Sequence, residues 1–383
     1  MWKHKSLVTA LTLSCLAAPV LANAAATTPA IPTVGEVLAA SGIEMYGHID
    51  GTYTLLSSTG KMSSGINTRA FDFEPNSFNL QAVSLTVSKL PSDGFGGLVT
   101  TTLGKDADII APYGTIDTTK GTAGGANVTF DLTQAYMHYN AGALTVIAGR
   151  YMTLAGAEVI QAPTNANLSR SILFMVGPYV HTGMRATYKA SDMLSVNAGV
   201  NNGWDDLKDT NINKTVELGF AFTPSPMFSL NAEIYSGVEQ ITNYPTVSTA
   251  QGTRNFIDML ATFNATDNLT LVLDFDLGTQ ENAVGSTGTA KWNVWAAYAN
   301  YKINDKWRVS VRGETLSDTD GYRTGIVQTW KEASLTAAYL PSKEMEFRAE
   351  VRTDSSNISA FNQPDGSTGK TQKSFGLQAL YKF

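Results

Sequence analysis

The chain has 383 residues, of which 43% are hydrophobic and 16% are charged, and its formal net charge is −6 at pH 7. The negative balance argues against nucleic acid as a partner. The hydrophobic fraction is too high for a disordered chain, and the polar residues are too evenly spread for a bundle of membrane helices.

Residues 1–24 have the features of a secretory signal peptide. Lys3 and Lys5 form a basic start, an apolar stretch covers residues 7–21, and Ala22-Asn23-Ala24 is a small-residue cleavage site. A transmembrane anchor is the alternative, but the apolar run is too short and ends in small residues. We therefore predict export and cleavage after residue 24.

The mature chain would contain no cysteine, because Cys15 is the only one. Removing Lys3 and Lys5 leaves 25 basic residues against 33 acidic ones, a net charge of −8. An exported protein without disulfides needs another source of stability, and a closed hydrogen-bonded barrel supplies one. Residues 25–42 are expected to be a short periplasmic segment, in which 34–40 form either a short helix or nothing stable.

From residue 43 onward, apolar and polar residues alternate as far as the C-terminus. In 269–277, leucine and phenylalanine at odd positions alternate with Thr270, Val272, Asp274 and Asp276. Successive side chains of a strand point to opposite faces, so each such segment has one apolar and one polar face.

The links between these segments alternate in length. Short links such as 140–142 and 304–306 alternate with long links such as 57–76 and 152–178. Short periplasmic turns and long outer loops are typical of outer-membrane barrels. We predict an all-β fold over 43–383, a transmembrane antiparallel β-barrel of about 16 strands with both termini in the periplasm; irregular stretches leave the count open by two. The predicted strands are 43–56, 77–90, 95–106, 127–139, 142–151, 179–189, 193–204, 214–224, 227–238, 253–264, 269–280, 290–303, 306–317, 326–340, 344–354 and 372–383.

Aromatic residues are expected to form girdles at the two membrane interfaces, because amphipathic rings prefer that depth. Scattered core aromatics are the alternative. The candidates near the turn ends, all on the outward parity, are Tyr188, Phe222, Phe228, Trp307, Tyr339 and Tyr381. Trp204 and Trp292 are the candidates near the loop ends, on the same parity.

The last strand alternates through Phe375, Leu377, Ala379 and Tyr381 and ends on Phe383. A last strand with a terminal aromatic residue resembles the signal that is read by the outer-membrane insertion machinery. We therefore predict Phe383 as an assembly signal.

Several short motifs resemble the outer-membrane β-barrel porin family of the OmpL-like kind. The resemblance covers most of the mature chain and implies an outer-membrane channel without catalytic residues. The motifs are Gly149-Arg150-Tyr151, Ser169-Arg170-Ser171-Ile172-Leu173-Phe174, His181-Thr182-Gly183-Met184-Arg185, Asn202-Gly203-Trp204-Asp205, and Arg312-Gly313-Glu314 followed by Asp318 and Asp320-Gly321.

The link 152–178 is the longest and the third of the long links. It resembles in position the third loop of general porins, which folds into the lumen and narrows it. It carries Glu158, Arg170 and an apolar stretch, 172–176, that is expected to form a short helix on the inner wall. An ordinary exposed loop is the alternative, but long loops are usually functional.

Charged residues on the inward parity are the candidates for the pore lining. Rows of arginine on the strands at 306–317 and 344–354 face acidic groups, and such rings tune which ions pass a pore. The alternative is that these charges pair and fill the lumen without sorting solutes. The candidates are Arg150, Glu158, Arg170, Arg185, Glu217, Glu233, Asp274, Asp276, Arg308, Arg312, Glu314, Arg348, Glu350 and Arg352.

Catalytic and metal-binding motifs are weak in this sequence. It has no Gly-x-Ser-x-Gly elbow and no His-Glu-x-x-His run, and Gly369-Lys370-Thr371 lacks the earlier glycine of a phosphate-binding Gly-x-x-x-x-Gly-Lys-Ser/Thr loop. Asp209-x-Asn211-x-Asn213 begins like a calcium loop but lacks the later glycine and glutamate. We assign no catalytic residue, no metal site and no cofactor.

The sequence favours a porin in the outer membrane of a Gram-negative bacterium, forming a water-filled channel for passive diffusion of small hydrophilic solutes and ions. About sixteen strands leave an aqueous channel, whereas about eight fill themselves. The alternative is a non-conducting barrel that acts as adhesin or receptor through its outer loops. Expected partners are outer-membrane lipid and lipopolysaccharide, the insertion machinery and the solutes; a homotrimer is left open.

Overall fold

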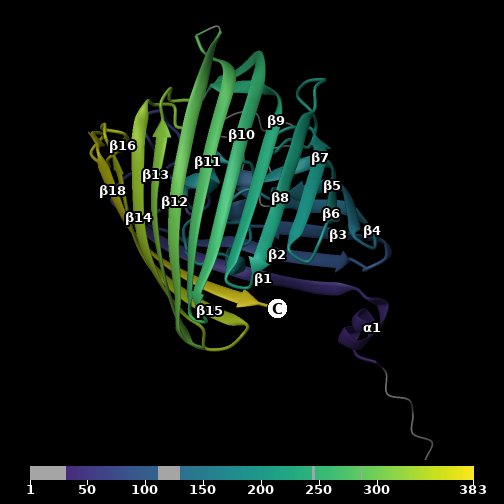
Figure 1. Cartoon of the computed structure of the whole chain (residues 1–383). Coiled ribbons are helices and arrows are strands. Elements are labelled where there is room, and N and C mark those ends of the chain that lie inside the picture. Colours follow the sequence, from purple (N-terminus) through teal and green to yellow (C-terminus); the bar gives the residue numbers. More distant parts are fainter. Residues whose placement is uncertain (1–31, 111–129, 244–245, 286) are drawn as a thin grey trace, which may run out of the picture.

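A computed structural model describes residues 32–110, 130–243, 246–285 and 287–383. Sixteen antiparallel strands form a closed barrel, shown in Figure 1. This confirms the predicted fold class and strand count. The barrel strands are β1 (Glu44–Leu56), β2 (Phe78–Lys89), β3 (Gly94–Leu103), β4 (Phe130–Ala141), β5 (Leu144–Met152), β6 (Val180–Lys189), β7 (Leu194–Asn201), β8 (Thr215–Ser225), β9 (Phe228–Asn243), β10 (Thr246–Thr266), β11 (Leu269–Val284), β12 (Gly288–Asn304), β13 (Trp307–Asp318), β14 (Gln328–Tyr339), β15 (Met345–Ser356) and β18 (Thr371–Lys382).

Closure of the barrel joins the first strand to the last. β1 pairs with β2 on one side and with β18 on the other, so neither strand has a free edge. The seam continues to the final residue, where Phe383 and Gly47 exchange two backbone hydrogen bonds of 2.8 and 3.1 Å. In the last outer loop, β16 (Phe361–Asn362) and β17 (Thr368–Gly369) form a separate small hairpin.

The predicted alternation is realised as two faces of the barrel wall. On β11, the side chains of Leu271, Leu273 and Leu277 are exposed on the outside, whereas Asp274 and Asp276 are fully buried inside. This arrangement, with apolar side chains outside and polar ones inside, is the reverse of that in a soluble protein, and it repeats around the barrel. An outward apolar band is what a lipid environment requires.

The described helices are short and lie outside the wall or in the loops. Helix α1 (Val34–Ser41) precedes the barrel, and its capping box pairs Thr33 with Glu36 through two backbone donors. Gly42 ends α1 at φ 69°, a left-handed conformation that favours glycine. The helical alternative for residues 34–40 is thus confirmed, and the predicted signal peptide lies outside the described residues. No helix in the described part of the chain is long and apolar enough to span a membrane.

Two gaps between predicted strands, 239–252 and 281–289, are wrong as outer loops, because the strands on either side continue through them. β9 and β10 extend over most of 239–252, and β11 and β12 over most of 281–289, so these hairpins rise above their neighbours in Figure 1. Above the membrane both faces of a hairpin meet water. Alternation of apolar residues therefore no longer marks these strand segments in the sequence.

The outward placement of Trp204 and Trp292 is also wrong. Trp292 is 0% exposed on the inner face of β12, opposite Gly278 of β11, where a Cβ would meet the indole ring at 2.0 Å. Trp204 lies in the outer loop after β7 and packs edge-on against Phe256 and Trp292. By contrast Tyr188, Trp307 and Tyr381 are exposed, as a girdle requires.

The buried apolar side chains gather inside the outer part of the barrel. There the inner faces of β9 to β14 carry Phe256, Trp292 and Trp330 instead of polar residues. Side chains of the outer loops, such as Met62 and Phe361, pack onto them. A second cluster combines Ala70, Phe71, Ile110, Ile160, Phe174, Tyr179 and Val180. The loops therefore fill much of the lumen on the outer side.

Candidate functional site

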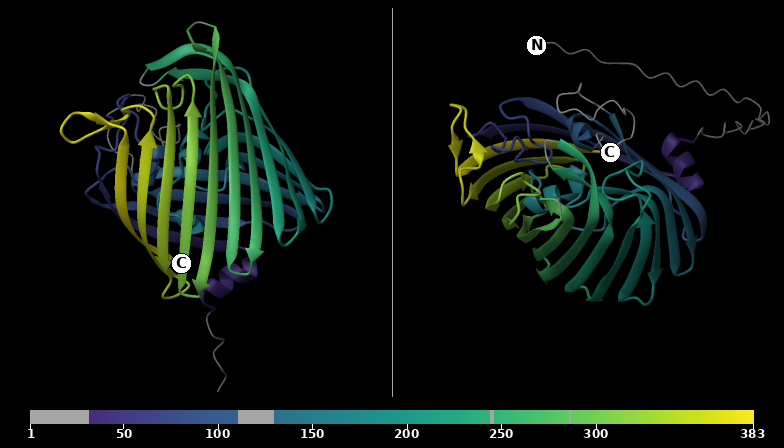
Figure 2. Two further views of the ribbon diagram at one scale, coloured as in Figure 1. Left: turned by 60° about the vertical axis from the view of Figure 1, so that its left-hand side comes forward. Right: turned by 90° about the horizontal axis from the view of Figure 1, so that it is seen from above.

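The segment between β5 and β6 lies inside the barrel. It contains a 3₁₀ turn, η2 (Ala162–Thr164), and the helix α3 (Ile172–Val176). Ser171 caps α3 by accepting a 2.8 Å hydrogen bond from the Phe174 amide. Four of the five helix residues are buried, and short teal segments lie within the ring of strands in Figure 2. The structure thus confirms the predicted helix, and we call residues 153–179 the inner loop.

Arg312 on β13 is the centre of the contacts between the inner loop and the wall. Its guanidinium pairs with Glu158 of the loop at 2.7 Å, and with Glu314 and Glu332 at 3.0 and 3.2 Å. It also donates to the Ser169 carbonyl at 2.8 Å. The side chain is 0% exposed, so this charge is neutralised entirely by protein groups.

Strand β15 holds the next part of the inner loop by its backbone. Arg348 donates to the carbonyls of Ala162 and Asn167 at 3.2 and 3.0 Å, and Arg352 donates to the Arg170 carbonyl at 2.7 Å. Between them, Glu350 accepts the amides of Leu168 and Ser169 at 2.9 and 3.2 Å. An alternating row of donors and acceptors on the wall therefore matches the polar backbone of the loop.

Two further charged residues of β13 complete this network. Glu314 accepts the Leu173 amide at the start of α3, at 3.0 Å. Arg308 lies nearer the turn end, is about one-quarter exposed, and pairs with Glu346 at 2.7 Å. Because Arg312, Arg348 and Arg352 are buried under the inner loop, we define these three residues as the arginine ladder.

Arg170 folds back onto its own loop. It donates to the carbonyls of Val159 and Ile160 at 3.0 and 2.6 Å, and its guanidinium lies 5.2 Å from the centre of the Phe71 ring. Burial lowers the pKa of this guanidinium, against the opposing charges of Asp106 and Glu158. Arg170 therefore stabilises the fold of the inner loop through hydrogen bonds to carbonyls of the same loop.

A second charged group lies on the wall formed by β6 to β9. Arg185 pairs with Glu217, donates to the Met152 carbonyl at 3.2 Å, and lies 4.4 Å over the ring of Tyr151. Glu233 accepts a 3.0 Å hydrogen bond from the side-chain amide of Asn197. This group fixes the start of the inner loop on the side opposite the ladder.

Three predicted candidates lie elsewhere. Arg150 is buried 3.7 Å from Asp131 of the neighbouring strand, away from the ladder. Asp274 and Asp276 form a buried cluster with Asp258, whose carboxylate oxygens lie within 4.8 Å of one another. The sequence offered no metal-ligand spacing here, because the cluster is assembled across two strands.

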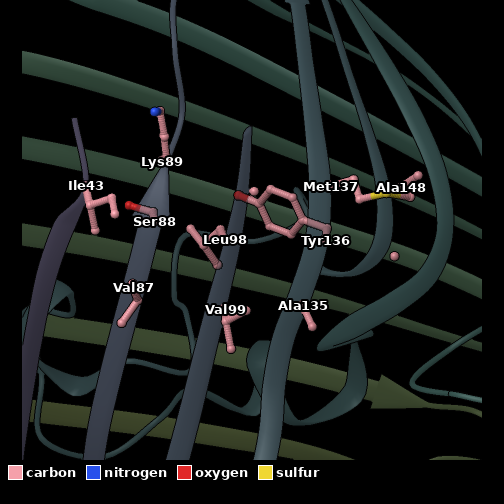
Figure 3. Close-up of a pocket in the computed structure, with 12 residues that line it drawn as sticks. Ile43, Val87, Ser88, Lys89, Leu98, Val99, Ala135, Tyr136, Met137 and Ala148 are labelled. Carbon is pink, nitrogen blue, oxygen red and sulfur yellow. The ribbon is translucent and has the colours of Figure 1, made fainter. Parts of the chain in front are cut away.

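A hollow of about 620 Å³ lies on the wall of β2 to β5, and Figure 3 shows the residues that line it. Val87, Val99 and Met137 in its lining belong to the exposed, outward set. Its lining is mostly apolar, and none of the ladder residues belongs to it. We therefore assign this hollow to the lipid-facing wall and not to a solute site.

A closed sixteen-strand barrel that holds an inner loop fits the result of a comparison with known families. The model of the family described as putative beta-barrel porin-2, OmpL-like, matches residues 42–383. The chain belongs to this porin family. The porin is therefore a protein of the Gram-negative outer membrane, and the resemblance found in the short motifs is confirmed.

Solved structures share the fold of the porin at low sequence identity. The outer membrane channel DcaP of Acinetobacter baumannii superposes with a TM-score of 0.60 at 14% identity, over 89% of this chain and 97% of that chain. OmpT of Vibrio cholerae, in its trimer form, gives 0.61 at 12% identity, over 89% and 99%. An anion-selective porin from Comamonas acidovorans gives 0.61 at 11% identity, over 89% and 99%. None of the curated proteins compared with the chain matches it significantly.

The porin differs from the sequence prediction mainly in what the charged residues contact. Arg312, Arg348, Glu350 and Arg352 were expected to line an open pore, and in the structure they lie beneath the inner loop. Sequence alternation predicts that a side chain lies on the inner face, but it does not predict which residues cover that side chain. The carbonyls within 162–170 that the three arginines bind have no side-chain signature from which the contacts could be predicted.

Proposed function

We propose that the porin is a passive diffusion channel for small hydrophilic solutes and ions, narrowed by the inner loop. The observation that carries the proposal is the attachment of this loop, inside the barrel, to the arginine ladder and to Glu350. A loop held by buried charge-assisted hydrogen bonds is a fixed part of the wall. The solute path would then run along the loop face that is turned away from the ladder.

Residues of that face and of the opposite wall are the proposed lining. Leu154 of the inner loop is 44% exposed, although it lies next to the buried hydroxyl of Tyr235. On the same wall as Tyr235, strands β6 to β9 carry Arg185, Glu217 and Glu233 on the inner face. These three side chains are buried like the arginine ladder, so we propose that one basic and two acidic charges bias the ion preference of the narrow section through their electric field and not by contact with ions.

The test is single-channel conductance of the refolded protein in a planar bilayer under a salt gradient. Stable ohmic steps support the diffusion channel, and the reversal potential gives the ion preference. A folded barrel without steps would favour the second candidate, a receptor or adhesin that acts through its outer loops. The apolar clusters that fill the outer lumen are the observation in favour of that candidate.

We also propose that the porin has no catalytic role. His181 is fully buried and stacks on Tyr235 with ring centres 4.6 Å apart. One ring nitrogen lies 3.1 Å from the Gly203 carbonyl. These contacts support a packing role for the imidazole.

A homotrimer is a further part of the proposal. A lipid-facing hollow of about 570 Å³ crosses β1, β2, β15 and β18, and its lining includes Tyr53, Phe78, Phe347 and Leu377. OmpT of Vibrio cholerae has been solved in a trimer form. Cross-linking in detergent, or native mass spectrometry, tests whether three copies assemble; a strictly monomeric porin would contradict it.

Phe383 is proposed to direct insertion. The terminal residue closes the seam with Gly47, and its ring is half exposed toward the lipid side. Deleting Phe383 should abolish heat-modifiable, membrane-inserted protein. Normal assembly of that variant would contradict the assignment.

A further inference from the structure

Three aspartates meet on the inner face of β10 and β11. Asp258 of β10 lies directly opposite Asp276 in the strand register, and Asp274 is the next inward residue of β11. Each is 0% exposed, and one oxygen of each lies within 4.8 Å of the others. The geometry brings three carboxylates to one buried point, which we call the aspartate cluster.

The cluster is not compensated in the way that the arginine ladder is. Within the described residues, five of its six oxygens accept no hydrogen bond: both of Asp258, both of Asp276 and one of Asp274. The sixth accepts the Ala157 amide of the inner loop at 2.8 Å. Three buried carboxylates with so few donors, the Ala157 amide on Asp274 and the Gly156 amide facing Asp258, cannot all stay ionised unless a positive charge enters.

The charged groups that face the cluster do not supply that charge in full. Arg323 acts on Asp276, but its guanidinium also lies over the rings of Trp204 and Trp292, 5.6 and 5.5 Å from their centres. Glu158 adds a further negative charge close to Asp274. The cluster therefore keeps a negative excess on the side of the barrel that has no arginine ladder.

Two observations outside the cluster point to a small ligand. A cavity of about 10 Å³ lies against Asp276, Gly156 and Gly177, and this is about the space for one water molecule or ion. On the adjacent strand, the Tyr298 hydroxyl is buried without a hydrogen-bond partner among the described residues, and it interacts electrostatically with Glu158 and Glu314 and, more weakly, with Asp274. Tyr298 shares the inner face of β12 and lies opposite Val272, one inward position along from Asp274.

The backbone of the inner loop approaches the cluster from two sides. A Cβ at Gly156, which has φ +84°, would lie 3.9 Å from an oxygen of Asp274. A Cβ at Gly177 would lie 3.9 Å from an oxygen of Asp276. Both ends of the inner loop therefore converge on the same three carboxylates.

We propose that Asp258, Asp274 and Asp276 bind one divalent cation, with Ca²⁺ as the preferred ion, and that the ion fastens the inner loop to β10 and β11. The donor set is entirely carboxylate oxygen, which suits hard cations. Oxygens that bind one Ca²⁺ ion at about 2.4 Å lie at most about 4.8 Å apart, and one oxygen of each aspartate lies within 4.8 Å of the others. The Tyr298 hydroxyl and water would complete the coordination shell.

The test is Ca²⁺ binding by the refolded full-length mature protein in detergent free of lipopolysaccharide. The protein is stripped with EDTA, dialysed against micromolar to millimolar Ca²⁺, and its metal content is measured. We expect one ion per chain in the wild type and none in the double variant Asp258→Asn, Asp276→Asn. That variant should fold, because both changes remove uncompensated buried charge.

The matched control is Asp209→Asn, in the outer loop. Asp209 already accepts from the Asn211 amide at 2.8 Å and pairs with Lys214, so its loss should leave binding at one ion per chain. Failure of the wild type to bind at 1 mM Ca²⁺ would overturn the proposal and leave shared protons as the neutralising charge. Binding retained in the double variant would overturn the assignment to these residues.

The binding measurement does not depend on the proposed diffusion role. Ca²⁺ should also raise the temperature at which the folded band is lost on gel electrophoresis in the wild type, but not in the double variant. Conductance with no Ca²⁺ binding would reject the cation site and keep the channel. Ca²⁺ binding with no conductance would reject the channel and keep the cation site.

Discussion

The walls at β13 to β15 and at β10 to β11 contact the same inner loop in opposite ways. On the first wall, Arg312, Arg348 and Arg352 are matched by carboxylates and by loop carbonyls. On the second wall, Asp258, Asp274 and Asp276 have almost no donors. Polar residues on the inner face of a barrel can therefore hold a loop in place on one side and form the proposed cation site on the other. Burial alone does not separate the two, but the count of satisfied oxygens and nitrogens does.

The largest expected effect comes from removing the central ladder charge. Arg312→Met would leave Glu158, Glu314 and Glu332 buried without their common partner, and breaking a buried network in this way costs about 3–5 kcal/mol. We expect the urea midpoint of the folded barrel to fall accordingly. Arg308→Met is the control, because its partly exposed pair with Glu346 should contribute less than about 1 kcal/mol. Equal decreases of the urea midpoint in the two variants would contradict the distinction between the buried Arg312 and the partly exposed Arg308.

On the wall formed by β10 and β11, removing a charge is expected to raise the free energy of unfolding instead of lowering it. Asp276→Asn removes one of three uncompensated carboxylates, so in EDTA the free energy of unfolding should rise by about 1–3 kcal/mol. In saturating Ca²⁺ the same variant should be less stable than the wild type, because a ligand is lost. Urea titrations in both conditions measure this crossing. A variant that is destabilised equally in both would show that Asp276 is satisfied without a cation.

The smallest effect concerns the outer loop between β7 and β8. Burial raises the pKa of Asp205 to about 6, and burial together with the charges of Glu239 and Asp205 raises the pKa of Asp206 to about 7. Both folded pKa values exceed the ordinary value of 3.8. The folded state therefore binds more protons than the unfolded state, and stability is lost as pH rises from about 4 to about 7.

Asp206→Asn isolates this contribution. We expect the unfolding midpoint of the wild type to fall between pH 5 and pH 8, and the variant to show a smaller fall. Asp192→Asn is the matched control at a periplasmic turn, where Asp192 is exposed and pairs with Lys189. A pH profile of Asp206→Asn that is identical to that of the wild type would contradict the role of this carboxyl.

Much of the fold could be predicted because a lipid environment imposes a simple rule. Alternation in segments such as 269–277 is enough to give the strands, their inward faces and the even count. The α3 helix could also be predicted, since 172–176 is a compact apolar stretch within a polar loop. The rule fails where the surroundings change, as in the β9–β12 extensions above the membrane and at Trp292, where loops replace water inside the barrel.

The candidate site could be predicted only in part. Inward placement of Arg312, Arg348 and Arg352 follows from strand parity. Their partners do not, because loop carbonyls are the same at every position in a sequence. The aspartate cluster was missed as a unit because Asp258 and Asp276 are brought together by strand register, which is set by turns and bulges and not by a spacing motif.

The central claim is that the inner loop, held inside the barrel by the arginine ladder, narrows the channel. The most direct measurement compares the single-channel conductance of the wild type with that of a variant in which residues 154–177 are replaced by a short Gly-Ser linker. The ladder should tolerate this, because Arg312 and Arg352 keep Glu332 and Asp354 as partners and regain water. The account predicts clearly larger steps for the variant. Equal conductance in two well-folded proteins would contradict it.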